Sequence, residues 1–378
     1  MKILFVSDDG LPDIRVEREI LTLVNQGREV HFIGPFKYTT LIDKELIKSV
    51  HDIKISAKAK LKIEPYYYWT RRKISKIIKS IKPDVIIGVN FFSTMLIYGL
   101  GYPIIFDDHD FNPLLIAFRY ITKEYKGYVQ NIIALRALSL MIKYGYKIVS
   151  EHITWTISEY IRRIYSIVTG SNNIYVLRNY PSEIELRSTP FIKLDKPPLK
   201  LCFFGSKLMR TYTSLIRRLK EPFLILNSLR EKGINMTISL YGVLNKEIEG
   251  ISLIEYKGYI PRTIDLLKQI AYTHACFLAW LPTPIQAYYS PNKLYQCMAS
   301  GSIPLVVNNM TEVIEEVGKG IITVNSIDFE HSLERVLLEL YSMETEELNR
   351  KRYQSYITIR KKPWEIYKHI INESIKKA

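Results

Sequence analysis

A histidine set among carboxylates follows a short apolar run in the first third of the chain. The run Ile104 to Asp107 predicts a buried strand, and Asp107-Asp108-His109-Asp110 comes at its end. In open α/β sheets, ligands bind beyond the carboxyl ends of the strands. A histidine there can bind a metal, exchange a proton or hydrogen-bond a substrate hydroxyl. We predict a functional role for His109 and give metal binding little weight, because clustered Asp side chains also cap helices.

The loop after the first expected strand, Lys2 to Ser7, holds a second group of polar residues. It contains Asp8, Asp9 and Gly10, and it lacks the Gly-x-Gly-x-x-Gly of dinucleotide-binding proteins. A Gly-x-x-x-x-Gly-Lys-Ser/Thr motif is also missing from the sequence. A dinucleotide-dependent dehydrogenase and a P-loop ATPase thereby lose their main support. The loop fits an ordinary turn with an Asp helix cap, and it also fits a loop that faces a substrate.

A helix start with an adjacent lysine stands in the last third of the chain. Ser290-Pro291-Asn292-Lys293 precedes the apolar helical segment Leu294 to Ala299. Proline in the first helical position, with serine before it, favours a helix start there. The exposed amides of a helix start suit a phosphate, and Lys293 adds positive charge. An ordinary capped helix is the alternative.

Positive charge gathers in two other stretches. One follows the expected strand Leu199 to Gly205 and fits either a diphosphate clamp or a solvated helix face; it contains Lys207, Arg210, Arg217, Arg218 and Lys220. The other, Lys58 to Lys82, interleaves Lys and Arg with Tyr66-Tyr67-Tyr68-Trp69. A solvated helix is the first interpretation of that stretch, followed by docking to an anionic membrane surface and then by nucleic-acid binding.

Composition sets the protein class. The 378 residues are 47% hydrophobic and 24% charged, which are globular proportions and exclude disorder, collagen and a disulfide scaffold. The net charge of +15 favours acidic partners such as nucleotides, phosphorylated substrates or anionic lipids. Three cysteines indicate a reducing compartment, and no apolar run approaches the roughly 18 residues of a spanning helix. We expect a cytoplasmic protein, with binding at the inner face of the membrane as the alternative.

Short apolar runs alternate with helical-period segments along the chain, which indicates parallel sheets covered on both faces. The polar, Pro-rich segment 182–198 separates two such series. We predict two doubly wound Rossmann-like domains facing a cleft. The predicted boundaries are 1–181 for the N-terminal domain, 182–198 for a linker, 199–360 for the C-terminal domain and 361–378 for a helix that crosses back to the first domain.

In order along almost the whole chain, these segments resemble the family 4 glycosyltransferases, which are retaining enzymes of the GT-B fold. The strand end FDDHD resembles the family's Asp-x-His-Asp/Glu, and ITWTISEYI and VLRNYP resemble two later motifs. The most specific match is SPNKLYQCMASGSIPLV, which is similar to the donor-site signature of one branch. Glu312 stands in the loop that follows in the family, and Trp364 looks like the tryptophan of the returning helix.

The resemblance implies transfer of a hexose-type sugar from a UDP- or GDP-linked donor to a hydroxyl acceptor that is a glycan, lipid-linked or protein-linked. It implies no cofactor and no metal, because helix amides and basic residues neutralise the diphosphate. His109 matches the histidine that contacts the donor sugar. The donor-binding residues implied are Gly205, Lys207, Arg210, Lys220, Tyr288, Ser290, Asn292, Lys293, Gln296 and Glu312. The acceptor would meet Asp8, Asp9 and Gly10 in the first domain.

The sequence departs from the family at three places. Tyr288 and Gln296 occupy the positions where the family has two glutamates, of which the second hydrogen-bonds the ribose. Gln can still accept one bond and donate another. The Arg and Lys after the first strand of the second domain are displaced, so that Lys207 or Arg210 stands for the Arg and Lys220 for the Lys. The first loop also lacks the paired glycines of the family.

Two other functions stay open on the sequence. The basic charge allows a nucleic-acid-binding protein, which the absence of a recognised nucleic-acid module disfavours. The missing glutamates allow a catalytically inactive GT-B-like binding subunit. Nucleotide binding separates the first alternative from a glycosyltransferase, and a turnover assay separates the second.

Overall fold

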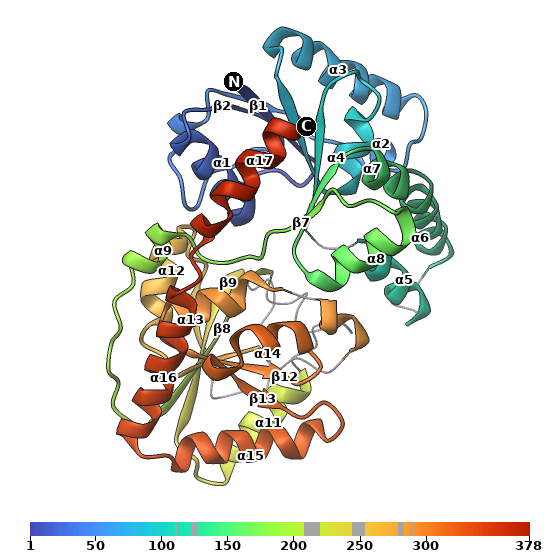
Figure 1. The fold of residues 1–378 in the computed structure, drawn as a ribbon. Coiled ribbons are helices and arrows are strands. Elements are labelled where there is room, and N and C mark those ends of the chain that lie inside the picture. The colour runs from blue at the N-terminus through green and yellow to red at the C-terminus, as the bar shows by residue number, and fades with distance from the viewer. Residues whose placement is uncertain (110–111, 123–126, 208–219, 244–253, 279–282, 289) are drawn as a thin grey trace. The chain divides into compact units, whose positions relative to one another are not determined.

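The computed structural model describes the chain except for residues 110–111, 123–126, 208–219, 244–253, 279–282 and 289 (Figure 1). The chain divides into two compact units. Unit 1 consists of Met1–Arg178 together with Glu365–Ala378, and unit 2 is Asn179–Trp364. Each unit is built around its own parallel sheet.

Unit 1 is a doubly wound sheet with strand order β3-β2-β1-β4-β5-β6-β7 and helices on both sides (Figure 1). Its strands are β1 (Lys2–Ser7), β2 (Glu29–Gly34), β3 (Ser49–Asp52), β4 (Val85–Val89), β5 (Ile104–Asp108), β6 (Ile153–Thr156) and β7 (Ile174–Val176). Its helices are α1 (Ile14–Asn25), α2 (Ala57–Lys60), α3 (Tyr66–Ile81), α4 (Asn90–Ile97), α5 (Asn112–Ile121), α6 (Tyr128–Leu140), α7 (Tyr146–Glu151), α8 (Glu159–Thr169) and α17 (Lys368–Lys377), with the short turns η1 (Lys44–Leu46) and η2 (Met141–Gly145). The central strands are buried on both faces, which is why they appear in the sequence as unbroken apolar runs.

Unit 2 repeats this plan with the order β10-β9-β8-β11-β12-β13. Its strands are β8 (Leu199–Lys207), β9 (Met236–Val243), β10 (Ile254–Gly258), β11 (Ala275–Phe277), β12 (Ile303–Val307) and β13 (Ile322–Val324). Its helices are α9 (Glu183–Arg187), α11 (Lys220–Glu231), α12 (Thr263–Ile270), α13 (Asn292–Ala299), α14 (Thr311–Val317), α15 (Phe329–Ser342) and α16 (Thr345–Arg360), with η3 (Pro284–Tyr288) and η4 (Gly318–Gly320), while η5 (Trp364–Tyr367) begins at its last residue. The prediction of two doubly wound Rossmann-like domains is confirmed.

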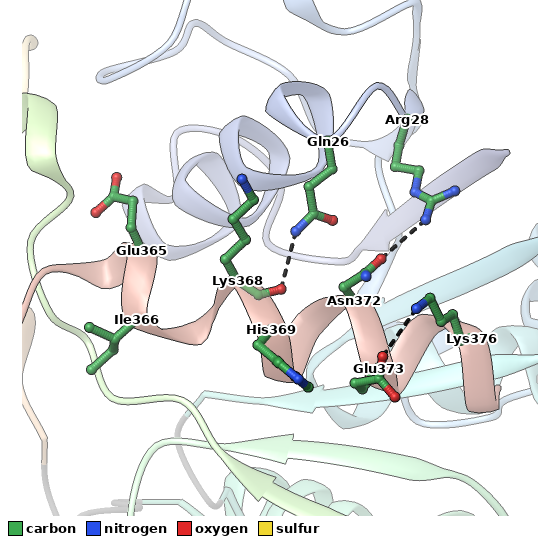
Figure 2. Close-up of a pocket in the computed structure, with 9 residues that line it drawn as sticks. All are labelled: Gln26, Arg28, Glu365, Ile366, Lys368, His369, Asn372, Glu373 and Lys376. Carbon is green, nitrogen blue, oxygen red and sulfur yellow. Dashed lines mark hydrogen bonds and ion pairs between the residues drawn. The ribbon is translucent and has the colours of Figure 1, made fainter.

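The C-terminal helix α17 belongs to unit 1, where it packs on the end of α1 (Figure 2). Gln26 Nε2 donates to the carbonyl of Lys368 at 3.1 Å, and Arg28 Nη2 donates to Asn372 Oδ1 at 3.1 Å. These residues line a pocket of about 710 Å³. Arg28 comes just before β2, so the pocket lies at the amino end of the sheet, opposite the edge where open α/β sheets bind ligands.

The segment 182–198, predicted to be a linker, contains helix α9. Ser182 and Glu185 form a capping box in which Ser182 N donates to Glu185 Oε2 at 2.8 Å and Glu185 N donates to Ser182 Oγ at 3.4 Å. Farther along, Asn349 of α16 receives the amide of Leu194 at 3.1 Å and donates back to its carbonyl at 2.9 Å. These contacts make the segment more ordered than its composition suggests. The helix was not predicted because five helical residues are too few to show an apolar period.

A disulfide joins Cys276 on β11 to Cys297 on α13, with the two Cα atoms 6.1 Å apart. This pair runs against the reduced state that we expect from the cysteine count. Cys276 and Cys297 are separated by 21 positions in the sequence and carry no signal of the pairing there, because the contact arises only when α13 packs back on the sheet. Within the part of the chain that the structure describes, we find no helix with the length and apolarity needed to cross a bilayer.

Candidate functional site

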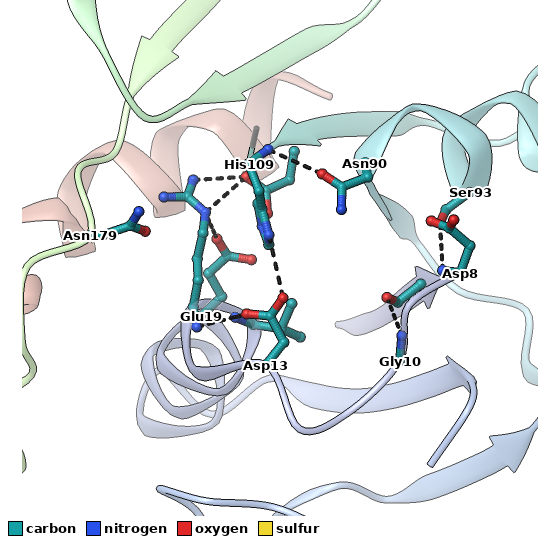
Figure 3. A network of polar contacts seen from close by, with 12 residues as sticks. Asp8, Gly10, Asp13, Glu19, Asn90, Ser93, His109 and Asn179 are labelled. Carbon is teal, nitrogen blue, oxygen red and sulfur yellow. Dashed lines mark hydrogen bonds and ion pairs between the residues drawn. The ribbon is translucent and has the colours of Figure 1, made fainter. Parts of the chain in front are cut away.

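The carboxyl ends of β1 and β4 meet at the point where the strand order of unit 1 reverses, which is the ligand-binding position of doubly wound sheets. Asp8 follows β1, and its backbone N–H donates to Ser93 Oγ of α4 at 2.8 Å (Figure 3). Ser93 Oγ in turn donates to Asp8 Oδ1 at 2.7 Å, and Lys60 Nζ lies 2.5 Å from Asp8 Oδ2. Burial raises the pKa of Asp8 and outweighs the opposing charge of Lys60. Asp8 is thus a fixed, buried group, whereas Asp9 is exposed.

Gly10 closes this loop in a conformation that requires glycine. Its φ is +78°, and a Cβ at this position would lie 1.9 Å from the carbonyl oxygen of Pro35. The N–H of Gly10 donates to Ser7 Oγ at 2.9 Å. The predicted residues Asp8, Asp9 and Gly10 therefore form a single well-defined turn. Their role in acceptor binding stays a prediction.

His109 lies at the carboxyl end of β5 with both ring nitrogens facing carboxylates (Figure 3). Nε2 pairs with Asp107 Oδ2, and Nδ1 lies 3.5 Å from Oδ2 of Asp13, the N-cap residue of α1. The backbone N–H of His109 donates to Asn90 Oδ1 at 3.2 Å. Asn90 follows β4 with a φ of +63°, a left-handed conformation that Asn adopts more readily than most residues.

Arg15 and Glu19 of α1 complete this network, and neither was among the residues predicted from the sequence. Arg15 Nη2 lies 2.8 Å from Asp107 Oδ1, Arg15 Nε lies 3.2 Å from Glu19 Oε1, and Arg15 Nη1 donates to the carbonyl of Leu177 at 2.5 Å. All three charged side chains are buried. In the sequence, Arg15 and Glu19 are four residues apart on one helix, which is the spacing of an ordinary surface ion pair. The only hint in the sequence is the helical spacing of Val16, Ile20 and Leu23, which puts the apolar face of α1 beside Arg15 and Glu19.

The charges in this network fix its protonation. Burial by itself would lower the pKa of His109, but Asp107 and Asp13 outweigh it and hold that pKa well above the usual range. Burial likewise opposes ionisation of Asp107, yet Arg15 and His109 keep its pKa well below normal. Burial and the charge of Asp107 raise the pKa of Glu19 well above its usual value. With a carboxylate facing each ring nitrogen and a raised pKa, His109 favours the imidazolium form, which suits fixed positive charge rather than accepting a proton.

Glu19, Asp107 and His109 offer ligand atoms within 4.8 Å of one another, which is the spacing of a metal site. Arg15 already lies against both carboxylates, and the imidazolium lies against one of them. A divalent ion would have to displace the Arg15 guanidinium, and His109 would have to lose a proton to bind it. The residues present therefore fit an internal ion network better than a metal centre.

The raised pKa of His109 predicts how stability depends on pH. An unfolded histidine releases its proton near pH 6.5, whereas folded His109 keeps it to higher pH. The stability that the imidazolium contributes is therefore complete below about pH 6.5 and is lost as pH rises through the folded pKa. We expect the stability difference between wild type and His109→Gln to shrink from pH 7 to pH 9 by up to about 1.4 kcal/mol per pH unit. Urea unfolding of both proteins at several pH values measures it, and a difference independent of pH would mean that folded His109 is neutral.

In unit 2 the strand order reverses between β8 and β11, and Lys293 lies there. A Cβ added to Gly205 of β8 would lie 2.5 Å from Lys293 Nζ, so glycine at 205 makes room for the ammonium group. The same Nζ lies 4.6 Å from the ring centre of Phe203. Two residues predicted for donor binding, Gly205 and Lys293, are thus brought together from positions 88 residues apart in the sequence.

The helix start before Lys293 differs from the prediction. Helix α13 begins at Asn292, and Pro291 is its N-cap with an extended ψ of 131° rather than its first helical residue. Ser290 does not cap the helix, because its hydroxyl lies 2.9 Å from the Tyr295 hydroxyl. Asn179 Nδ2 supports this turn by donating to the carbonyl of Ser290 at 2.7 Å. Asn179 belongs to the VLRNYP motif, which was the available signal for it.

The remaining predicted donor residues divide into three groups. Gln296, one turn into α13, and Glu312, in the first turn of α14, are both buried. Tyr288 ends η3 and is partly exposed. The backbone of Lys207 ends β8 and that of Lys220 begins α11, but their side chains lie outside what the structure describes, as does Arg210 entirely. Donor binding by all of these residues stays a prediction.

No protein-family model matches the chain, and no curated protein matches it. Solved structures do. The α,α-trehalose-phosphate synthase (UDP-forming) from Burkholderia vietnamiensis matches over 100% of both chains with a TM-score of 0.68 and 8% identity. Sucrose-phosphate synthase from Thermosynechococcus elongatus matches over 100% of this chain and 98% of its own, with a TM-score of 0.66 and 10% identity. A trehalose-6-phosphate structure from E. coli with bound UDP-2-fluoro glucose matches over 100% and 99%, with a TM-score of 0.64 and 10% identity.

The chain has the GT-B fold. At such low identity the likeness establishes the fold alone. The neighbours described are trehalose-phosphate and sucrose-phosphate synthases, so the narrower resemblance to family 4 and its SPNKL-type branch stays a prediction.

Proposed function

We propose that this GT-B chain is a retaining glycosyltransferase that moves a hexose-type sugar from a UDP- or GDP-linked donor to a hydroxyl acceptor. Its structural neighbours include UDP-forming and UDP-sugar-bound enzymes. The observation that carries the proposal is the ammonium group of Lys293 against Gly205, at the strand-order reversal of unit 2 and in the first turn of α13. A fixed cation beside helix amides is a site for phosphate.

In this proposal unit 2 binds the nucleotide-sugar. The diphosphate lies at the start of α13 with Lys293, and Gln296 one turn later serves the ribose. Positive charge and amide dipoles stabilise the departing diphosphate, while the sugar passes through an oxocarbenium-like transition state. No metal and no further cofactor is required, because the protein supplies the compensating charge.

Unit 1 supplies the acceptor side. The turn of Asp8, Asp9 and Gly10 binds the acceptor, and His109 acts on the donor sugar as a fixed imidazolium. Asp107, Asp13 and Arg15 hold that ring and are positioning residues. The acceptor hydroxyl belongs to a glycan, a lipid-linked sugar or a protein-linked sugar.

Nucleotide binding without metal tests the donor site. We expect UDP or GDP to bind in calorimetric titration with EDTA present, and Lys293→Gln to weaken that binding by roughly 10- to 100-fold, the scale of a hydrogen bond to a charged group. Lys232→Gln is the matched control. Lys232 is exposed and precedes β9, so it lies at the amino ends of the strands, opposite the carboxyl ends where the donor site is proposed. Unchanged nucleotide affinity in Lys293→Gln would contradict the proposal that the diphosphate binds at the start of α13.

Turnover separates the enzyme from its alternatives. Release of UDP or GDP from nucleotide-sugars, measured with a panel of hydroxyl acceptors in EDTA, supports a metal-independent transferase. Loss of turnover in EDTA that a divalent ion restores would contradict metal independence. Nucleotide binding with no transfer would instead favour an inactive binding subunit.

A further inference from the structure

We propose that unit 1 carries a docking surface for an anionic lipid bilayer, formed by the exposed apolar side of α6 and the basic, aromatic residues beside it. The proposal does not depend on the glycosyltransferase activity. It rests on side chains that the structure leaves at the surface, on two contacts that bring separate segments together, and on the local charge.

Helix α6 exposes apolar side chains along most of its length. Tyr128 is 82% exposed and Val129 68%, and Ile132, Ile133 and Leu135 are each nearly half exposed. Spacings of three and four residues put Tyr128, Ile132 and Leu135 on one side of the helix, with Val129 and Ile133 next to them. The inward residues Ala134, Ala137 and Leu140 are buried. Single apolar residues on a surface are ordinary, but a contiguous set of this kind marks an interaction site.

The loop between α2 and α3 adjoins this side of the molecule. Arg136 Nε of α6 donates to the carbonyl of Leu61 at 3.4 Å, and Lys62 Nζ donates to Tyr144 Oη of η2 at 2.5 Å. Figure 1 shows α2, α6 and α7 on the same side of unit 1. Ile63, just after the contacts, is exposed.

Helix α3, which follows this loop, adds exposed aromatic residues to the surface. Tyr68 and Trp69 lie in its first turn, and Trp69 is 63% exposed. The contacts at Leu61 and Lys62 therefore join the first part of the expected basic, aromatic stretch to the apolar helix, although about 60 residues separate them in the sequence.

The charge near this surface is mostly positive. The sequence 127–151 contains Arg136, Lys143 and Lys147 and a single acidic residue, Glu151, which lies 3.7 Å from Lys147 Nζ. The stretch 58–82 contains nine Lys and Arg residues against Glu64 alone. The exposed basic side chains include Lys58, Arg72, Lys73, Lys76, Lys79, Arg136 and Lys143.

An anionic bilayer satisfies both properties of this surface at once. Aliphatic side chains enter the boundary of the acyl chains, Trp and Tyr rings settle at the headgroups, and Lys and Arg meet the anionic phosphates. A second copy of the chain fits poorly, because a two-fold contact would press the same positive surface against itself. The polar acceptor proposed above, if lipid-linked, would reside on such a membrane.

Vesicle co-sedimentation tests the docking surface. We expect wild type to bind vesicles of phosphatidylcholine with 30% phosphatidylserine, and to bind pure phosphatidylcholine vesicles at least tenfold more weakly. The triple variant Val129→Ser, Ile132→Ser, Ile133→Ser should lose at least tenfold in partitioning to the anionic vesicles. The variant Arg72→Gln, Lys73→Gln, Lys76→Gln, Lys79→Gln should lose most of the preference for anionic lipid. All seven replaced side chains are exposed, so folding, followed by circular dichroism, should be retained.

The matched control carries three equivalent changes in unit 2, Leu224→Ser, Ile327→Ser and Leu338→Ser, at exposed apolar positions. It should bind the anionic vesicles as wild type does. The proposal is overturned if wild type stays in the supernatant, or if the α6 variant sediments as well as the control. It is also overturned if light scattering finds a wild-type dimer that the α6 variant turns into a monomer, or if duplex DNA binds where vesicles do not.

Discussion

Replacing Arg15 with methionine should lower the free energy of unfolding by about 3–5 kcal/mol, the usual cost of breaking a buried ion pair. Arg15 is 1% exposed and lies between Asp107 and Glu19. Without the guanidinium, two buried carboxyl groups lose their shared counter-charge, and the carbonyl of Leu177 loses its donor. Denaturant unfolding followed by fluorescence measures the loss.

Two further variants make this result specific. Arg163→Met replaces an exposed arginine of α8 and should change stability by no more than about 0.5 kcal/mol. The double variant Arg15→Met, Glu19→Gln should recover part of the loss, because it also removes a buried carboxyl group that has lost its partner. A loss below about 1 kcal/mol in Arg15→Met would mean that water already screens the network, contrary to the burial described above.

Replacing His109 with glutamine should lower turnover of the nucleotide-sugar by about 100-fold or more, the scale for losing one preorganised group at a reacting centre. Nucleotide affinity should stay within about threefold. The reason for the split is that His109 belongs to unit 1, whereas Lys293 and Gly205 belong to unit 2. Steady-state kinetics together with calorimetric titration separate the two quantities.

His152→Gln is the control for this experiment. His152 precedes β6 at the amino ends of the strands, whereas His109 lies at their carboxyl ends. It should leave both turnover and affinity unchanged. Equal loss of affinity and turnover in His109→Gln would place His109 in nucleotide binding instead. No loss in either quantity would reduce it to a structural ion pair with Asp107.

The sequence alone determined the architecture. Strands such as β1, with the run Ile3 to Val6, and β12 (Ile303–Val307) are apolar without alternation, because a parallel sheet buried on both faces leaves no polar positions to alternate with them. The helical spacing of Val16, Ile20 and Leu23, with Gly27 as a C-cap, predicts a helix from Arg15 to Gln26, and α1 spans Ile14–Asn25. The strand-end position of His109 and the helix after Pro291 also followed from local patterns, since the ends of such strands and helices carry their own turn and capping residues.

Only the tertiary structure decided which distant residues meet. The sequence pattern of Arg15 and Glu19 is that of surface charges, but the packing of α1 puts them against Asp107. Lys293 lies against Gly205 only because α13 packs beside β8. The disulfide between Cys276 and Cys297 and the exposed side of α6 were missed for the same reason. Periodicity records which residues share a face of one helix, but burial and pairing depend on what packs against that face, and that partner comes from elsewhere in the chain.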